Sequence, residues 1–182
     1  LRGFGYDGRI HTVRPAVSPE FYPGDKRQLQ IAYMPRKRGV EIVYFQGLFR
    51  SLYPEYAEVP WVKIDGCSRQ ECGDILRASA IFSSFSWFEG LGLPPLEAMA
   101  CGSIVVGLHG GGGLDYANEG NGFWVSEGDY HQFAHKLAYA ISRYKSEGLA
   151  EMQQRGLETS RRYNQDEFRG SLLAAWRTIL DA

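Results

Sequence analysis

A regular alternation of short apolar segments and segments of helical periodicity runs through residues 29–145 and limits the folds open to this chain. Five apolar segments are predicted to be strands, at residues 29–34, 61–64, 80–85, 103–108 and 122–125. The fourth is apolar almost throughout, which is typical of a strand covered on both faces of its sheet. Strands that alternate with helices form parallel sheets. The sequence therefore predicts an α/β fold, a Rossmann-like, doubly wound parallel sheet of about five strands.

The helices expected between and after these strands have capping residues at their starts. Ser68, with Glu71 three residues later, has the pattern of a capping box. Asn164 and Asp129 stand before two later helices in the same manner. The predicted helices are residues 39–52, 68 onward, 94–101, 129 onward, about 148–162 with an interruption at Gly156, and 164 onward.

Apolar residues at helical spacing define one face of three of these helices. The faces consist of Val40, Val43, Tyr44, Leu48 and Leu52 in the first helix, Phe133, Leu137, Ile141 and Tyr144 in the helix after Asp129, and Phe168, Leu172, Trp176 and Ile179 in the last one. We expect these faces to pack against the rest of the domain.

Composition limits the class of protein. The chain has 182 residues, of which 44% are hydrophobic and 14% aromatic, so it suits one globular domain with its own core and is not disordered. A formal net charge of −1 argues against a dedicated nucleic-acid binder. No apolar run approaches the ~20 residues that span a bilayer. The three cysteines form no CxxC pair and suit a reducing compartment, so we expect a cytoplasmic protein.

The chain divides into a leading segment and a domain. Residues 1–28 lack periodicity and are rich in glycine, proline and charge, so we expect an interdomain linker or N-terminal extension. Residues 29–182 are predicted to form the Rossmann-like domain, which ends in a helical segment over about residues 148–182. The chain opens at Leu1, without methionine or a signal-peptide pattern, so we expect it to be a piece of a longer protein.

Residues 84–102 hold the densest set of candidate functional groups. A predicted strand runs there into a glycine-containing loop and then into a helix. Gly90 and Gly92 let the backbone approach a ligand closely, and a helix N-terminus directs free amides at it, which suits a diphosphate. Glu89 and Glu97 flank the loop, and carboxylates accept paired hydrogen bonds from the vicinal hydroxyls of a ribose or hexose. The combination predicts a nucleotide-sugar site.

Each of these features also has a purely structural interpretation. The helix dipole alone favours Glu97 in a first turn, and Glu89 fits a solvated loop. Trp87 and Phe88 either shape the pocket or fill the core, and the core is favoured for Phe88. The four glycines at residues 110–113 either lie against the ligand or form a surface loop.

The same stretch resembles a long family signature. Residues 89–102 read EGLGLPPLEAMACG, which is similar almost throughout to the Glu-x7-Glu signature of retaining GT-B glycosyltransferases, specifically glycosyltransferase family 4, the group 1 glycosyltransferases. Residues 14–23 resemble the linker that enters the donor domain, residues 33–36 the end of its first strand, and residues 121–125 a later strand. The resemblance covers about residues 13–145 and implies the C-terminal, donor-binding half of a GT-B fold.

The resemblance also implies roles for individual residues. Glu89 is expected to bind hydroxyls of the donor sugar, and Glu97 those of the ribose. Arg36 is expected to be a cation for the diphosphate, as an arginine fork matches phosphate oxygens. The backbone contacts to sugar and diphosphate are expected at Gly90, Leu91, Gly92 and Leu93.

The chain departs from the family pattern in two places. The lysine that partners the family's arginine lies about five positions further on, where this chain has Glu41. Lys37 or Arg38 is expected to be the second cation in place of that lysine. Of the two, Lys37 is counted with Glu89 and Arg36 among the expected catalytic residues. Only about 25 residues separate this cationic segment from the strand at residues 61–64, so we expect a smaller sheet than the family's, with base contacts near residues 64–67.

The function implied by the resemblance is transfer of a sugar, with retention, from a nucleoside diphosphate to a glycan or lipid-linked acceptor, as in polysaccharide biosynthesis. We expect no cofactor and no metal, since the cations stabilise the leaving diphosphate. The acceptor groups are expected on an N-terminal domain outside this chain, at the cytoplasmic face of the membrane or in the cytoplasm. The fragment alone is then expected to be inactive. Two alternatives are a GT-B-like nucleotide-sugar epimerase and a non-catalytic nucleotide-binding or assembly module.

Overall fold

The fold is built on one parallel sheet. The computed structural model describes residues 8, 10–146 and 148–181. Its strands are β1 (Gln28–Tyr33), β2 (Trp61–Lys63), β3 (Ser79–Glu89), β4 (Ile104–Gly111) and β5 (Gly122–Val125). All neighbouring strands run parallel, in the order β2-β1-β3-β4-β5, and Ile31 on β1 lies between Trp61 on β2 and Ile81 on β3. The predicted Rossmann-like α/β fold with a parallel sheet of about five strands is confirmed.

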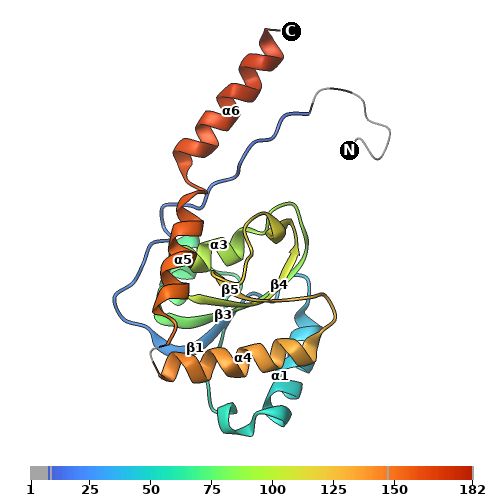
Figure 1. The fold of residues 1–182 in the computed structure, drawn as a ribbon, viewed down its shortest axis with the longest axis vertical. Coiled ribbons are helices and arrows are strands. Elements are labelled where there is room, and N and C mark those ends of the chain that lie inside the picture. Colours follow the sequence, from blue (N-terminus) through green and yellow to red (C-terminus); the bar gives the residue numbers. More distant parts are fainter. Residues whose placement is uncertain (1–7, 9, 147, 182) are drawn as a thin grey trace.

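Helices cover both faces of the sheet, so it is doubly wound (Figure 1). The helices are α1 (Gly39–Leu52), α2 (Arg69–Ala78), α3 (Leu93–Ala100), α4 (Tyr130–Lys145), α5 (Ala150–Arg161) and α6 (Gln165–Leu180), with short 3₁₀ turns η2 (Pro54–Tyr56) and η3 (Gly112–Asp115). Helices α1 and α4 lie on one face, and α2, α3 and α5 on the other. Each face therefore has its own apolar core.

The predicted caps are present. The Ser68 hydroxyl accepts a hydrogen bond from the amide of Glu71, and the Glu71 carboxylate accepts one from the Ser68 amide, which completes a capping box at α2. Asp129 caps α4 through its side chain, and Asn164 caps α6. These local patterns fix helix starts because each satisfies amides that the helix itself leaves free.

The predicted apolar face of α1 is wrong. Val40, Val43 and Tyr44 are 66–75% exposed, whereas Phe45 and Phe49 are buried. The Phe45 ring lies 4.3 Å from that of Phe133 on α4 and 5.3 Å from that of Phe85 on β3, measured between centroids. The helix carries two apolar faces, and the face with the larger aromatic rings is the one buried.

The structure also corrects the predicted loops after residues 85 and 108. Strand β3 continues to Glu89 and β4 to Gly111, and the two extensions pair with each other. Glycines permit this close approach: a Cβ on Gly110 would lie 2.7 Å from Cβ of Ser86, and one on Gly112 would collide with the carbonyl of Glu89. Phe88, predicted for the core, is 82% exposed on the extension.

The C-terminal helices differ from the prediction in two respects. Helix α5 passes through Gly156 without interruption, because this buried glycine faces Met99 on α3 and allows the two helices to pack closely. The predicted apolar face of α6 is half-buried at Phe168 and Leu172 and exposed in its C-terminal half, with Trp176 at 53% and Ile179 at 48%. Figure 1 shows α6 projecting from the body beside the N-terminal segment. Within the described part of the chain, no helix is both long and apolar enough to cross a membrane.

Candidate functional site

The candidate site lies where the winding of the sheet changes direction. From β1 the chain crosses through α1 to β2 on one side, and from β3 it crosses through α3 to β4 on the other. Ligands of such sheets bind beyond the carboxyl ends of the strands at this switch point. Arg36 and Lys37 directly follow β1, and Glu89 ends β3. The fold thus brings the predicted catalytic residues to one edge.

Two adjoining pockets open at this edge. The larger, of about 330 Å³, is lined by Phe21, Met34, Arg36, Ile64, Asp65, Gly66, Cys67, Ser68, Arg69, Cys72, Leu93, Pro94 and Glu97. The smaller is lined by Met34, Arg36, Lys37, Phe82, Ser84, Phe85, Ser86, Trp87, Glu89 and Pro94. Arg36 lines both, so it stands where the pocket lined by Glu97 adjoins the pocket lined by Glu89.

Glu97 occupies a half-buried position on α3. Burial raises the pKa of its carboxyl, while the positive charges of Arg36 and Arg69 act in the opposite direction. Its carboxylate forms no ion pair or hydrogen bond with any described residue. A partly desolvated carboxylate that faces a pocket and remains free to accept hydrogen bonds is typical of a binding site.

Glu89 and Lys37 form an ion pair across the smaller pocket, with 3.2 Å between Oε1 and Nζ. The two side chains come from the ends of different strands, and both are partly exposed. A pair this exposed contributes little to stability. Both groups can therefore exchange their partner for a ligand at small cost.

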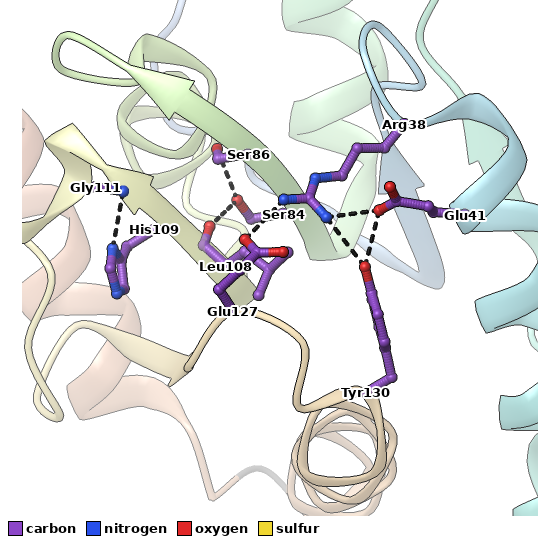
Figure 2. A network of polar contacts seen from close by, with 9 residues as sticks. All are labelled: Arg38, Glu41, Ser84, Ser86, Leu108, His109, Gly111, Glu127 and Tyr130. Atoms are coloured by element: carbon purple, nitrogen blue, oxygen red, sulfur yellow. Dashed lines mark hydrogen bonds and ion pairs between the residues drawn. The ribbon is translucent and has the colours of Figure 1, made fainter.

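Arg38 lines neither pocket, and its guanidinium is bound in a cluster with Glu41, Glu127 and Tyr130 (Figure 2). Its Nη1 donates to Glu41 at 2.5 Å and to the Tyr130 hydroxyl at 3.0 Å, and its Nη2 donates to Glu127 at 2.7 Å. Its guanidinium also stacks on Trp87 at 4.0 Å. The sequence left the second cation open between Lys37 and Arg38, and the geometry places Lys37 in the pocket.

The start of α3 offers fewer free backbone amides than a helix N-terminus normally does. Helix α3 begins at Leu93, and Pro94 and Pro95, which have no N–H, occupy the next two positions. Leu93 is therefore the one residue of this first turn that offers an amide. Neither Leu91 nor Gly92 donates its amide to another described group. Of residues 91–93, Leu93 lines the larger pocket.

The histidines and the acidic groups give no sign of a metal site. The ring of His109 accepts a hydrogen bond at Nδ1 from the amide of Gly111, which is a contact within β4. Across the residues that the structure places, no three or more His, Cys, Asp or Glu side chains are grouped so that they could hold a metal ion.

Comparison with known families identifies the family of this chain. Residues 64–158 match the family described as "Glycosyl transferases group 1". The chain belongs to this family of glycosyltransferases. The matched residues include Glu89, Glu97 and the whole segment between them, while Arg36 and Lys37 lie before it.

A curated relative matches a longer part of the chain than the group 1 glycosyltransferase family does. The chain is 37% identical over 150 residues to an alpha-1,6-glucosyltransferase of Actinobacillus pleuropneumoniae serotype 7 (strain AP76), covering 79% of this chain and 45% of that protein. It therefore spans less than half the length of this curated relative.

Solved structures share the fold. A variant of S. aureus TarM, crystallised with fondaparinux, alpha-GlcNAc-glycerol and UDP, is similar with a TM-score of 0.75 at 17% identity, over 94% of this chain and 40% of that one. The C-terminal domain of a group 1 glycosyltransferase, LpcC from Francisella tularensis, is similar with a TM-score of 0.58 at 20% identity, over 84% of this chain and 96% of that one. The chain thus has the fold of one half of a GT-B glycosyltransferase.

Two groups of contacts next to the candidate site are not predictable from the sequence. The cluster around Arg38 depends on Glu127 and Tyr130, which follow it by about ninety residues. Tyr116, buried behind the loop at residues 90–93, donates a hydrogen bond to Gly92 at 2.6 Å. No local sequence pattern indicates Glu127, Tyr130 or Tyr116, because the residues that they contact are distant in the sequence.

Proposed function

We propose that the chain is the donor-binding, C-terminal half of a retaining glycosyltransferase that takes its sugar from a nucleoside diphosphate. The position of Arg36 between the Glu97 pocket and the Glu89 pocket carries the proposal. A nucleotide sugar has its diphosphate between a ribose and a second sugar. A cation flanked by two hydroxyl-binding carboxylates matches that order of groups.

Each group then has one role. Glu97 accepts hydrogen bonds from the ribose hydroxyls, and the base lies toward residues 64–67. Arg36, Lys37 and the amides of residues 91–93 bind the diphosphate. Glu89 orients the sugar through its hydroxyls.

The chemical contribution of these residues is electrostatic. As the glycosidic bond to the diphosphate breaks, negative charge grows on the leaving oxygen, and fixed cations stabilise it in the transition state. Arg36 and Lys37 supply this charge without a metal ion. Glu89 is a binding group, and the proposal assigns it no covalent step.

Transfer needs more than this chain. We infer that an N-terminal domain supplies the acceptor site. The acceptor is a glycan or a lipid-linked sugar, and transfer takes place in the cytoplasm or at the cytoplasmic membrane face during polysaccharide assembly. The name of the 37% identical relative favours glucose as the sugar, and the UDP bound to TarM favours a uridine donor. The chain alone is expected to bind the donor and transfer nothing.

Calorimetric titration of UDP, GDP and dTDP against this chain tests the donor site. We expect one nucleotide to bind best and Glu97→Ala to weaken it by about tenfold or more, because two ribose hydrogen bonds to a charged acceptor are lost. Glu58→Ala is the matched control, since Glu58 is exposed in the loop before β2. Equal affinity for all three nucleotides in every variant contradicts the proposal.

The reaction itself is tested with the longer, two-domain protein and a panel of nucleotide sugars. Transfer with retained anomeric configuration supports the proposal. An altered nucleotide sugar formed without acceptor indicates an epimerase, and binding without any turnover indicates a non-catalytic module.

A further inference from the structure

The peptide group that links Gly92 to α3 is held in an unusual conformation. Gly92 is buried and adopts φ +79°, a region that residues with a side chain rarely enter. Its carbonyl oxygen accepts a hydrogen bond of 2.6 Å from the hydroxyl of Tyr116. Tyr116 follows η3, so the loop after β4 is tied to the loop after β3.

Tyr116 is itself rigidly placed. Its side chain is buried, and its ring makes edge contacts with Trp124 and Tyr163, each 5.9 Å away between centroids. The Asn121 side chain donates to the Tyr116 carbonyl at 2.7 Å. Burial raises the pKa of the phenol, so the hydroxyl remains a donor at neutral pH.

The contact fixes the direction of a second group. The Gly92 carbonyl and the Leu93 amide belong to one planar peptide unit, in which C=O and N–H point in opposite directions. Holding the oxygen toward Tyr116 therefore directs the Leu93 N–H away from it. Leu93 lines the larger pocket, whereas Tyr116 does not. No other described group accepts a hydrogen bond from this amide.

We propose that Tyr116 is a positioning residue that aims the Leu93 amide at the diphosphate of the donor. The inference rests on the proposed function, since that function places the diphosphate beside residues 91–93. Pro94 and Pro95 make this amide more important, because they provide no donors of their own. A hydrogen bond to the carbonyl also polarises the peptide unit and strengthens its N–H as a donor.

The test compares UDP with uridine, which lacks the phosphates, on the wild-type chain and on Tyr116→Phe. This substitution keeps the ring and removes one hydroxyl. We expect UDP affinity to fall about threefold to tenfold and uridine affinity to stay unchanged. The control is Tyr163→Phe, which alters the neighbouring ring without touching Gly92 and should leave both affinities as they are. Thermal unfolding of each variant reports its folding.

A second measurement on the wild type covers the case in which Tyr116→Phe does not fold. The NMR amide resonance of Leu93 should shift on addition of UDP and not on addition of uridine, and the absence of that difference overturns the inference. If the wild type prefers UDP but Tyr116→Phe binds it equally well, or loses both ligands alike, the inference fails while the proposed function stands. Equal wild-type affinity for UDP and uridine overturns both.

Discussion

Glu97 keeps a carboxylate in a half-buried position, and this has a cost for folding. Because burial raises its pKa above the ordinary glutamate value, the folded protein holds a proton there more tightly than the unfolded chain does. By linkage, stability falls as the pH rises from the unfolded pKa through the folded one, and the loss is complete above both. The site thus retains a charged group that the fold alone does not favour.

Glu97→Gln should therefore raise the thermal unfolding midpoint at pH 7 and leave it nearly unchanged at about pH 3, where the wild-type carboxyl is protonated in both states. Differential scanning calorimetry at the two pH values measures the difference. Glu58→Gln, at an exposed position in the loop before β2, is the control substitution. A gain of equal size at both pH values would contradict the assigned cause.

Single residues of the site differ in how far the sequence could predict them. Glu89 and Glu97 stand in a continuous signature, so their positions on adjoining elements follow from the local sequence. Lys37 and Arg38 are adjacent cations with the same chemistry. Their surroundings differ only because Glu127 and Tyr130 bind Arg38. The packing of α4 against the sheet brings these two partners close to Arg38.

Among the secondary-structure elements, the strands and caps were predictable because they depend on residues a few positions apart. The buried face of α1 was not, since the helix has two apolar faces and the choice depends on aromatic rings of β3 and α4. The extensions of β3 and β4 were not either. They form only when the two strands pair, whereas glycines after an apolar segment predict a loop.

Two glycines in different elements should respond oppositely to alanine. Gly47 lies in α1 with open space around its Cβ position, so Gly47→Ala should stabilise the chain by up to about 1 kcal/mol. Gly107 on β4 has φ +131°, and a Cβ there would lie 2.5 Å from the Phe133 ring. Gly107→Ala should therefore lower the free energy of unfolding by about 2 to 4 kcal/mol. Urea unfolding of both variants measures this, and equal effects would contradict the packing of β4 against α4.

For the molecule as a whole, α6 is an appendage of the body. Trp176 is 53% and Leu180 77% exposed, and Figure 1 shows the helix leaving the α/β layers. Removal of residues 165–182 should shift the unfolding midpoint by less than about 4 °C, since little apolar area is lost from the core. Circular dichroism melting checks this. Truncation after residue 149 is the control and should destabilise strongly, because α5 packs on α3.

The ion pair between Lys37 and Glu89 bears on how an anionic ligand reaches the site. Long-range steering needs uncompensated charge, and here Lys37 is already neutralised while the chain carries a net charge of −1. Arg36 and Arg69, which line the larger pocket, form no ion pair with a described residue, and these charges beside Glu97 attract an anion mainly within about 10 Å in physiological salt. Capture is then decided at contact range, and the association rate should change little with ionic strength.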